Sequence, residues 1–401
     1  MTGPETGRTP PSIVTLVALA GLSALSMNVF LPSLPGMARW FQVDYGVMQL
    51  SVSVYLAVTA ILQLFVGPIS DMFGRRPVML GALVIFLLAT IGTLLAPTAE
   101  WFLVFRMMQA VIAAGMVLSR AVVRDIVPGD AAASLLGYVT MGMSIVPMLA
   151  PIFGGMLDEA FGWKANFAMM GLLGLAVLIL CWFDMGETSR PGGVPLRAQF
   201  AQYPVLARSW RFWGYSIVAM LASGSFFAYL GGAPYIGETV FHLTSSQVGY
   251  WFAAPAVGYA LGNYISGRYA VRIGMNRLIL LGTLASVLPL AVVLLADILG
   301  WHQPLVFFGG VTMVGLGNGL VLPSANAGMM SVRPELAGTA SGFGGAMMVA
   351  GGAVMATLAG ALLSPTSGAA PLLWIMLLSA VGALVTIRLV IKRQKRLDQT
   401  G

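Results

Sequence analysis

Residues 67–78, GPISDMFGRRPV, concentrate charge in a chain that otherwise avoids it. These twelve positions hold one acid, two arginines, two glycines and two prolines, and they lie between two long apolar runs. Only 9% of the 401 residues are charged, whereas 58% are hydrophobic. A soluble protein of this length needs more charge to cover its surface, so the bilayer is the expected solvent. The charged stretch therefore predicts a connection between two membrane-spanning segments.

Apolar segments that can cross about 30 Å of hydrocarbon recur throughout the chain. The first begins at Ile13, is too long for a signal-peptide core and has no small-residue cleavage site, so we expect it to be retained. Twelve such spans place both termini on the same side of the membrane. The predicted spans are 13–37, 48–69, 77–97, 101–120, 132–157, 165–184, 211–234, 247–267, 276–297, 303–326, 337–362 and 370–391.

Lysine and arginine lie mainly on one side of these spans, and this asymmetry sets the orientation. The connections on the outer side hold only Arg39 and Lys164. Both termini are therefore predicted to be cytoplasmic, and the net charge of +7 reflects orientation rather than nucleic-acid binding. The basic tail is interpreted as a retention charge or a contact with anionic lipids. The cytoplasmic basic residues are Arg75, Arg76, Arg120, Arg124, Arg190, Arg197, Arg208, Arg268, Arg272, Arg333, Lys392, Arg393, Lys395 and Arg396.

The longest polar stretch, GETSRPGGVPLRAQFAQYPVLARSW at residues 186–210, divides the chain into two similar halves. GPISDMFGRRP begins at Gly67 and GRYAVRIGMNR at Gly267, and Gly274 stands where Gly74 stands in the first copy. This offset of 200 residues indicates duplication. We predict an all-α integral membrane protein with an N-terminal six-helix bundle (1–186), a cytoplasmic linker (187–210) and a C-terminal six-helix bundle with a basic tail (211–401). Two such halves are one of the parallel-repeat transporter architectures.

Enzymatic and metal-dependent functions find little support in the residue types present. Cys181 is the single cysteine, and the two histidines, His242 and His302, lie far apart in sequence. These residues favour neither a metal site nor a Ser-His-Asp centre. The sequence GLGNG at Gly315 lies inside a predicted span with no strand before it, so it is not a nucleotide-binding loop. We therefore predict no enzyme, no metal and no cofactor, and exclude ATP-driven transport by this chain alone.

Several motifs resemble those of the major facilitator superfamily, and the likeness covers nearly the whole chain. GPISDMFGRRP is similar to the loop signature between the second and third helices. FRMMQAVIAAG resembles the fourth-helix motif, with Arg106 at the motif arginine. VPMLAPIFGG resembles the fifth-helix antiporter motif, with Ala150 in place of the usual glycine. The segments SGSFFAYLGGAPYI and SANAGMMSVRPELAGTASGF are similar to the Bcr/CflA group of bacterial drug-resistance exporters. The resemblance implies a twelve-helix transporter of the bacterial inner membrane.

The charged stretch is interpreted as a conformational latch. Asp71 is costly to bury unless it is paired, and Arg75 one turn further is a candidate partner. The resemblance also places this acid at the N-terminus of a helix in the opposite half, where the helix dipole favours negative charge. The alternative is that the arginines only anchor the loop inside the cell. The predicted latch and coupling residues are Asp71, Arg75, Arg76, Arg106, Arg124 and Asp125.

Arg106 lies inside the fourth span, with Gln109 one turn further. An arginine there is expensive unless it faces a water-filled cavity or a partner, and the alternative is that it snorkels to the outer surface. The resemblance implies a role in proton coupling or substrate binding. In the fifth span, prolines and small residues allow a bend and close packing with neighbouring helices. The family resemblance implies that this bend seals the central cavity against leak. These antiporter-motif residues are Gly142, Pro147, Pro151, Gly154 and Gly155.

The first span departs from the pattern of related antiporters, which commonly have an acid where this chain has Asn28. Asparagine cannot carry a proton. None of the fourteen acids lies near the midpoint of a predicted span. Three accounts stay open: protonation at Asp71 or Asp125 as the latch moves, competition between substrate and proton through Arg106 and water, or facilitated transport with weak or no proton coupling.

Without a midspan acid, a strongly cationic substrate has no counter-charge. We therefore predict a secondary active exporter of small neutral or zwitterionic, amphenicol-like drugs, driven by protons; the alternative is a facilitator or a transporter of a native metabolite. The expected partners are the substrate, protons and membrane lipids, with no nucleic acid, and the chain is expected to act as a monomer. The predicted substrate-binding residues are Met27, Asn28, Phe30, Tyr55, Gln63, Arg106, Gln109, Tyr138, Phe226, Phe227, Tyr229, Asn263, Asn318 and Asn326.

Overall fold

The computed structural model describes residues 10–126, 146–147, 149–188, 203–333, 336–364 and 366–400, and its regular structure there is helical. The helices run in this order: α1 (Ile13–Asn28), η1 (Leu31–Ser33), α2 (Leu34–Phe41), α3 (Tyr45–Phe73), α4 (Arg75–Leu95), α5 (Ala99–Gln109), η2 (Ala110–Ile112), α6 (Ala113–Ile126), α8 (Lys164–Asp184), α10 (Tyr203–Ala207), α11 (Trp210–Thr239), α12 (Ser245–Ile273), α13 (Met275–Ile298), α14 (Pro304–Ser331), α15 (Ala337–Leu362) and α16 (Ala370–Thr400). Residues 149–161 are also helical and are called helix 149–161 below.

Ten helical stretches in the described part of the chain are long and apolar enough to cross a membrane. Two predicted spans are not among them. The span 247–267 falls within α12, which has 29 residues but also carries polar side chains such as Gln247 and Asn263. The span 132–157 lies partly outside the described residues, which include 146–147 and its last turns within helix 149–161. The total of twelve spans therefore stays a prediction.

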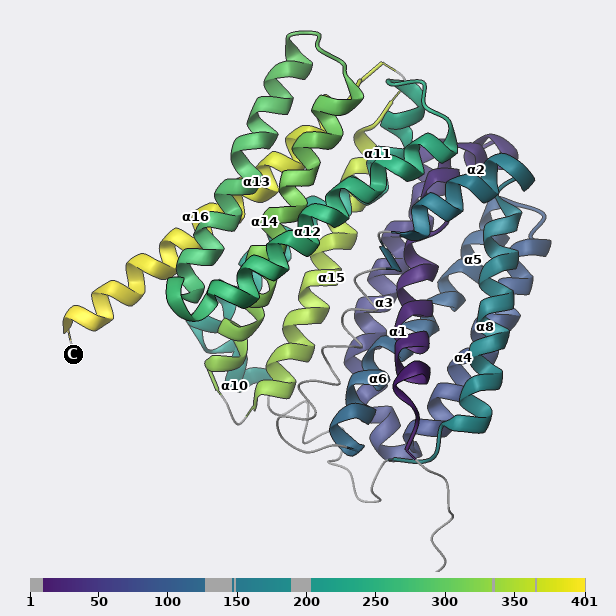
Figure 1. The fold of residues 1–401 in the computed structure, drawn as a ribbon, viewed down its shortest axis with the longest axis horizontal. Coiled ribbons are helices and arrows are strands. Elements are labelled where there is room, and N and C mark those ends of the chain that lie inside the picture. Colours follow the sequence, from purple (N-terminus) through teal and green to yellow (C-terminus); the bar gives the residue numbers. More distant parts are fainter. Residues whose placement is uncertain are drawn as a thin grey trace, which may run out of the picture.

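The helices form two groups that stand side by side (Figure 1). The first half comprises α1 to α8, and the second half comprises α11 to α16. One hydrophobic core extends through both halves, and a smaller cluster lies in the second half alone. We call the end of the molecule with Arg75 and Lys392 the basic end, and the opposite end, with Arg39 and Asp158, the far end. The limits of the halves at residues 186 and 211 stay predictions.

The first span is not one straight helix. Ser12 caps α1 by accepting a hydrogen bond from the backbone N–H of Thr15 at 3.3 Å. The helix ends at Asn28, and a 3-10 turn leads into α2. Pro32 and Pro35 occupy the first turns of these two elements, where proline is well tolerated. A Cβ atom at Gly154 would overlap the carbonyl oxygen of Val29, so only glycine lets helix 149–161 pack on this break.

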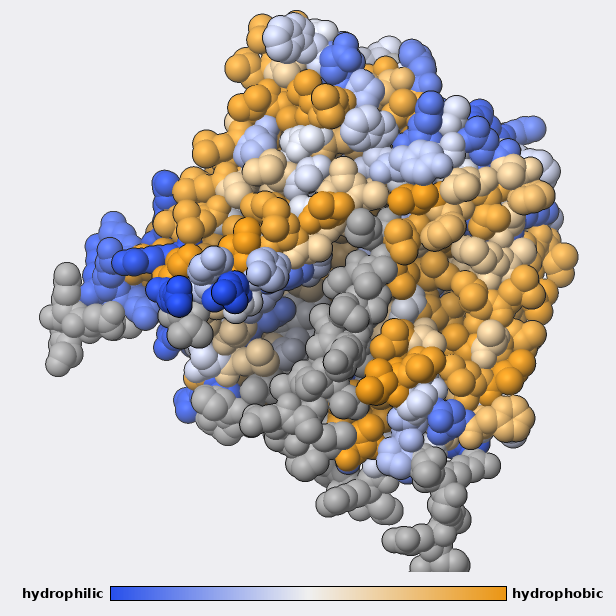
Figure 2. Space-filling view, viewed as in Figure 1, coloured by the Kyte–Doolittle hydropathy of each residue, from blue (hydrophilic) through white to orange (hydrophobic). Residues whose placement is uncertain are grey.

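The outside of the bundle is apolar along its flanks. Figure 2 shows hydrophobic side chains over most of the visible face and hydrophilic ones gathered near the C-terminal part of α16 and at the far end. Large apolar side chains are exposed on several helices, among them Leu95, Leu172 and Phe183. A soluble protein rarely exposes so much apolar surface, whereas lipid covers it without cost. This surface supports the membrane-spanning arrangement.

Candidate functional site

Arg106 on α5 is fully buried between the first-half helices. Its Nε donates to the carbonyl of Ser51 at 3.3 Å, and its Nη2 donates to the carbonyl of Ser26 at 2.7 Å. Its Nη1 donates to the Ser26 hydroxyl at 3.2 Å and to Oε1 of Gln109 at 2.9 Å. All four acceptors are neutral oxygens. A buried charge is costly unless its donors are satisfied, and these four bonds supply most of that need.

Two aromatic rings enclose the guanidinium of Arg106. Its Cζ lies 4.4 Å from the ring centroid of Phe30 and 4.0 Å from that of Tyr55. Aromatic faces attract cations, and the attraction grows when water is excluded. Among the ion pairs of the described residues, none involves Arg106. The side chain therefore does not snorkel to the surface, and its charge is held by rings and neutral oxygens. We call this arrangement the arginine box.

Gln109 connects the arginine box to α4 through hydrogen bonds. Its Oε1 accepts from Arg106, and its Nε2 donates to the Thr90 hydroxyl at 2.7 Å. Thr90 in turn donates to the carbonyl of Phe86 at 2.7 Å, within α4. Sequence reasoning identified the arginine, the glutamine and both rings but missed Ser26, Ser51 and Thr90. Small hydroxyl residues inside apolar spans carry no charge signal, so only the three-dimensional packing reveals them.

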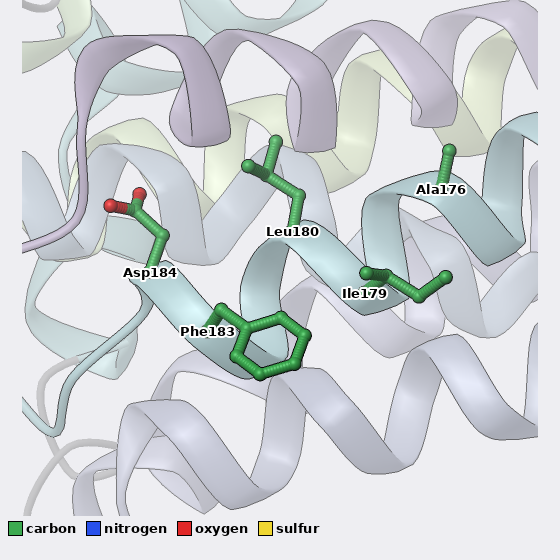
Figure 3. Close-up of a pocket in the computed structure, with 5 residues that line it drawn as sticks. All are labelled: Ala176, Ile179, Leu180, Phe183 and Asp184. Carbon is green, nitrogen blue, oxygen red and sulfur yellow. The ribbon is translucent and has the colours of Figure 1, made fainter.

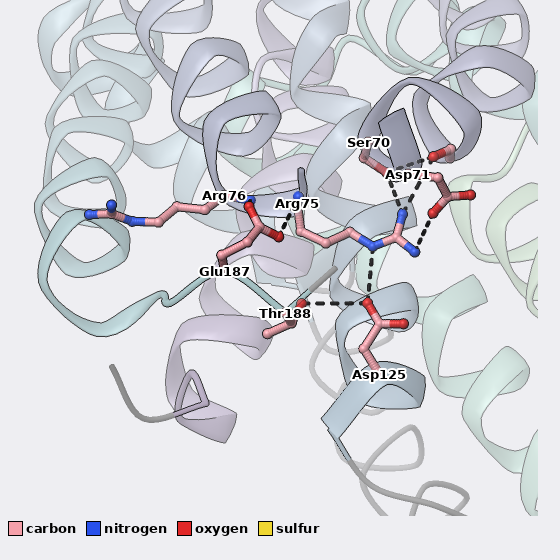
Figure 4. A network of polar contacts seen from close by, with 8 residues as sticks. Ser70, Asp71, Arg75, Arg76, Asp125, Glu187 and Thr188 are labelled. Carbon is pink, nitrogen blue, oxygen red and sulfur yellow. Dashed lines mark hydrogen bonds and ion pairs between the residues drawn. The ribbon is translucent and has the colours of Figure 1, made fainter. Parts of the chain in front are cut away.

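Three of the predicted latch residues, Asp71, Arg75 and Asp125, form a network at the basic end (Figure 4), whereas Arg106 lies apart in the arginine box. Nη2 of Arg75 lies 2.5 Å from Oδ1 of Asp71, and its Nε lies 3.0 Å from Oδ2 of Asp125. Its Nη1 also donates to the Ser70 hydroxyl and to the carbonyl of Gly67. Arg75 is only 8% exposed, so these two carboxylates balance a nearly buried charge. Arg124 lies one residue before Asp125 on α6, but its side chain is outside the described part.

The network includes two residues that sequence reasoning did not select, both at the start of the linker. Glu187 accepts hydrogen bonds from the backbone N–H of Arg75 at 2.9 Å and of Arg76 at 3.3 Å. It therefore caps the N-terminus of α4, where a carboxylate is favoured by the free N–H groups and the helix dipole. The Thr188 hydroxyl lies 3.4 Å from Oδ2 of Asp125. The available signal was an acid three residues after the predicted span 165–184.

Arg76 behaves differently from its neighbour. Its Nη2 donates to the carbonyl of Trp182 at 2.9 Å, and its Cζ lies 5.6 Å from the ring centroid of the same tryptophan. The side chain thus reaches along the end of α8 and does not join the carboxylates around Arg75 (Figure 4). The two arginines of the motif consequently hold two different helices, α6 and α8, to the start of α4.

The first-half substrate-binding candidates divide into two groups. Phe30, Tyr55 and Gln109 lie in the arginine box with Arg106. Asn28 is buried and donates its side-chain amide to the carbonyl of Ala24 at 2.7 Å, so that donor is used within α1. Met27 is partly buried against the hydrophobic core, and Gln63 of α3 is also partly buried. Tyr138 and Gly142 lie outside the described residues.

In the second half, the aromatic candidates of α11 belong to a packed cluster. The ring of Tyr229 lies 4.9 Å from Phe252 and 6.1 Å from Phe226, measured between centroids. Tyr229 is fully buried, and its hydroxyl has no hydrogen-bond partner among the described residues. Phe227 is also buried. Three asparagine candidates lie on other helices: Asn318, which is buried on α14, and Asn263 and Asn326, which are partly buried on α12 and α14.

A shallow groove of about 630 Å³ lies on the surface of α8, away from the arginine box. Figure 3 shows its lining residues, Ala176, Ile179, Leu180, Phe183 and Asp184. The carboxylate of Asp184 already accepts a hydrogen bond from the backbone N–H of Ser12 at 2.8 Å and another from the Thr15 hydroxyl. This groove is therefore an apolar surface depression whose one charged residue fixes the start of α1.

The family description "Major Facilitator Superfamily" matches residues 16–356 and 234–399. The chain belongs to the major facilitator superfamily. It is a multi-pass protein of the bacterial cytoplasmic membrane.

Several relatives carry names that refer to drug resistance. The bicyclomycin resistance protein homolog of Haemophilus influenzae is 29% identical over 374 residues, which are 91% of this chain and 92% of that protein. The chloramphenicol resistance protein of Pseudomonas aeruginosa is 29% identical over 324 residues, 79% of this chain and 76% of that one. Multidrug resistance protein D of Escherichia coli is 27% identical over 362 residues, 90% and 91% of the two chains.

A solved structure supports the fold. The bacterial homolog of the human lysosomal transporter Spinster, in an inward-facing and occupied conformation, matches with a TM-score of 0.74. The match covers 97% of this chain and 98% of that one at 15% identity. At this identity the likeness concerns the fold alone, and it agrees with the arrangement of helices in Figure 1.

Proposed function

We propose that the chain is a secondary active exporter of small amphipathic drugs, neutral or zwitterionic and amphenicol-like, which it exchanges for protons by alternating access. Relatives named for resistance to bicyclomycin, chloramphenicol and multiple drugs support drug export. The basic end is proposed to face the cytoplasm with both termini. The proposed architecture is two six-helix bundles, residues 1–186 and 211–401, which rock about a site between them.

One observation carries the choice of substrate class: Arg106 is buried between Phe30 and Tyr55 with neutral oxygens as its partners. A cationic drug that approached this site would meet an uncompensated positive charge. A neutral drug with hydroxyl or amide oxygens can instead replace the Ser26 hydroxyl or the Gln109 amide as an acceptor. The two rings provide flat apolar surface for the rest of such a molecule.

The proposed proton coupling does not run through the first helix. Asn28 cannot titrate, and its amide donor is used by the carbonyl of Ala24. Asp71 and Asp125 are the proposed alternatives, because both pair with Arg75 and both change surroundings if the basic end opens and closes. The latch thereby links the proton to the movement of the halves.

The second candidate function is facilitated transport of a drug or a native metabolite without proton coupling. The observation that favours it is Asn28, whose side chain does not titrate, at a position where the family resemblance implies that an acid is common in related antiporters. Under this alternative, Asp71 and Asp125 act only as structural partners of Arg75. The two candidates differ in whether a drug gradient alone, or a proton gradient, drives net movement.

Everted membrane vesicles that hold a respiratory pH gradient separate these candidates. A pH-sensitive dye reports proton efflux when a drug is added, and radiolabelled chloramphenicol reports flux directly. Proton release on drug addition, lost in Arg106→Ala and retained in the exposed control Arg268→Lys, is the expected result. Drug flux without proton release would establish the facilitator. If a panel of neutral drugs produces neither proton release nor drug flux, the proposed substrate class is wrong.

A further inference from the structure

Asp158 and Glu159 lie near the end of helix 149–161, where the first half meets the second at the far end. We propose that these two acids form a far-end latch at the N-terminus of α12 in the opposite half: Glu159 holds that end closed, whereas Asp158 in its ionised form opposes closure. The proposal shares with the proposed function only alternating access, in which the two ends open in turn. It requires neither a particular drug nor proton coupling.

Glu159 reaches the first turn of α12 across the boundary between the halves. Hydrogen bonds from the Ser246 and Thr244 hydroxyls and from the Ser246 backbone N–H lower the pKa of its carboxyl group. The first N–H groups of a helix have no intrahelical acceptor, and the helix dipole favours an anion there. The Thr244 hydroxyl also accepts a hydrogen bond from the backbone N–H of Gln247 in a capping box. Ionised Glu159 therefore adds a second, inter-half cap and stabilises the closed far end.

Asp158 bridges hydroxyl groups of both halves. Ser33, just before α2, and Ser245, the first residue of α12, both hydrogen-bond to its carboxylate. Burial nevertheless raises the pKa of Asp158, outweighing those two bonds and the nearby Arg39, while the charge of Glu159 contributes to the rise. Arg39 and Glu159 are the charged groups that face it from the described elements. Closure thus desolvates this carboxylate, so its ionised form opposes closure.

The backbones beneath the two acids are in direct contact. A Cβ atom at Gly155 would overlap the carbonyl oxygen of Ser245, and one at Gly249 would overlap the carbonyl oxygen of Pro151. Helix 149–161 and the first turns of α12 therefore touch without intervening side chains. Any movement that opens the far end has to separate this contact, and Asp158 and Glu159 lie at its outer edge.

Other contacts close the far end but lack this arrangement. The Tyr45 hydroxyl donates to the carbonyl of Gly231 at 2.6 Å, and Nε2 of Gln49 donates to the carbonyl of Ala356 at 2.7 Å. These bonds are neutral. The ion pair of Arg39 with Glu238 is exposed, with side-chain exposures of 67% and 33%. Exposed pairs contribute little to stability. Asp158 and Glu159 differ from these contacts because they bring charge to the N-terminus of α12, directly beside the backbone contact between the halves.

Distances across the far end test the latch directly. In a Cys181→Ser background, Leu95→Cys and Leu299→Cys place nitroxide labels on exposed positions near the far ends of α4 and α13. Double electron–electron resonance in lipid nanodiscs at pH 7, without drug, gives the ratio of long to short distances. Glu159→Gln is expected to raise this ratio about two- to fivefold, the range set by a charge at a helix N-terminus. Ser246→Ala, which removes a donor from the other half, is expected to raise it less.

Asp158→Asn is expected to change the ratio of long to short distances in the opposite direction. Added to Glu159→Gln, it removes a carboxylate that closure desolvates, so the ratio is expected to fall back toward the wild-type value. Glu100→Gln is the matched control, because Glu100 lies at the far end but hydrogen-bonds to Thr98 in its own half. An unchanged ratio in Glu159→Gln, or a further rise when Asp158→Asn is added, would overturn the proposal. Because no drug is present, failure here leaves the proposed export function untouched, and failure of drug transport leaves the latch untouched.

Discussion

Gly74 and Gly274, 200 residues apart, adopt nearly the same backbone conformation but serve different chemistry. Their φ and ψ angles are 95° and 149° in the first half and 86° and 144° in the second. The helices before them, Tyr45–Phe73 and Ser245–Ile273, have the same length and the same offset. Beside Gly74 stand Asp71 and Arg75, whereas Val271 and Met275 occupy the matching positions beside Gly274.

This difference shows that both halves share the backbone of the repeat, whereas the charged residues beside the turn occur in the first half. A helix–glycine–helix turn needs only a residue that tolerates the unusual φ and ψ, so both halves keep glycine. The carboxylate–arginine network and the arginine box occur in the first half, among the described residues. The second half contributes a packed aromatic cluster around Tyr229 and the helix N-terminus that the far-end latch holds.

Among the substitutions that test the difference between the halves, replacement of Arg106 is expected to have the largest effect, and that effect is on transport. Arg106→Ala leaves Gln109 and the Ser26 carbonyl without their donor, and transport in vesicles is expected to fall at least about tenfold, as for a lost buried charge-assisted bond. Arg106→Lys keeps the charge but lacks the planar group that fits between Phe30 and Tyr55. It should therefore restore only part of the activity. Full activity in Arg106→Lys would show that charge alone is required.

Alanine substitutions at Gly74 and Gly274 are expected to lower thermal stability by different amounts, because the two turns have different neighbours. Both substitutions place a side chain in a backbone region used almost only by glycine, at a cost of about 1–3 kcal/mol each. At Gly74 the new Cβ would also crowd Glu187, whose Cδ lies 3.0 Å from that position, whereas nothing lies within 4 Å at Gly274. Gly74→Ala should therefore lower the thermal unfolding temperature in detergent more than Gly274→Ala.

The helical residue Gly81, which also has open space around it, provides the control for backbone strain. Gly81→Ala should leave the unfolding temperature unchanged or raise it, because alanine favours helix. Equal losses at Gly74 and Gly274 would mean that Glu187 moves aside without cost and that the two turns are equivalent in energy as well as in shape.

The sequence predicted the repeated elements better than the contacts between them. The segment expected at 247–267 lies within the helix Ser245–Ile273, although that helix is not among the ten stretches apolar enough to cross a membrane. Helical periodicity and turn glycines are local signals. The pairing of Asp71 with Arg75 is also local, one helical turn apart. Asp158 and Glu159 could be assigned only to an outer connection, since nothing local says which helix N-terminus they meet. Long-range partners of this kind depend on how the two halves pack.

Glu187 is expected to have a smaller effect than the glycines, because it acts through one helix terminus. Glu187→Gln keeps an acceptor for the N–H groups of Arg75 and Arg76 but loses the charge, which is worth about 0.3–1 kcal/mol at a helix N-terminus. A small fall in unfolding temperature is expected. The matching control is Asp44→Asn at the N-cap of α3, where the side chain makes no capping bond. An equal fall in both variants would argue against a specific role for the linker carboxylate.

The smallest effect is the pH response of the far end, and its sign distinguishes the two acids. The pKa of Glu159 is lowered by its bonds to α12, so its closing contribution is present above the ordinary value of 4.5 and is lost as pH falls through the lowered value. The pKa of Asp158 is raised by burial, so the closed form gains relative stability as pH falls through that raised value. In Asp158→Asn, acidification from pH 7 to 4 should therefore open the far end, whereas in Glu159→Gln it should close it. Label distances that respond in the same direction in both variants would show that the two carboxylates do not act separately on the gate.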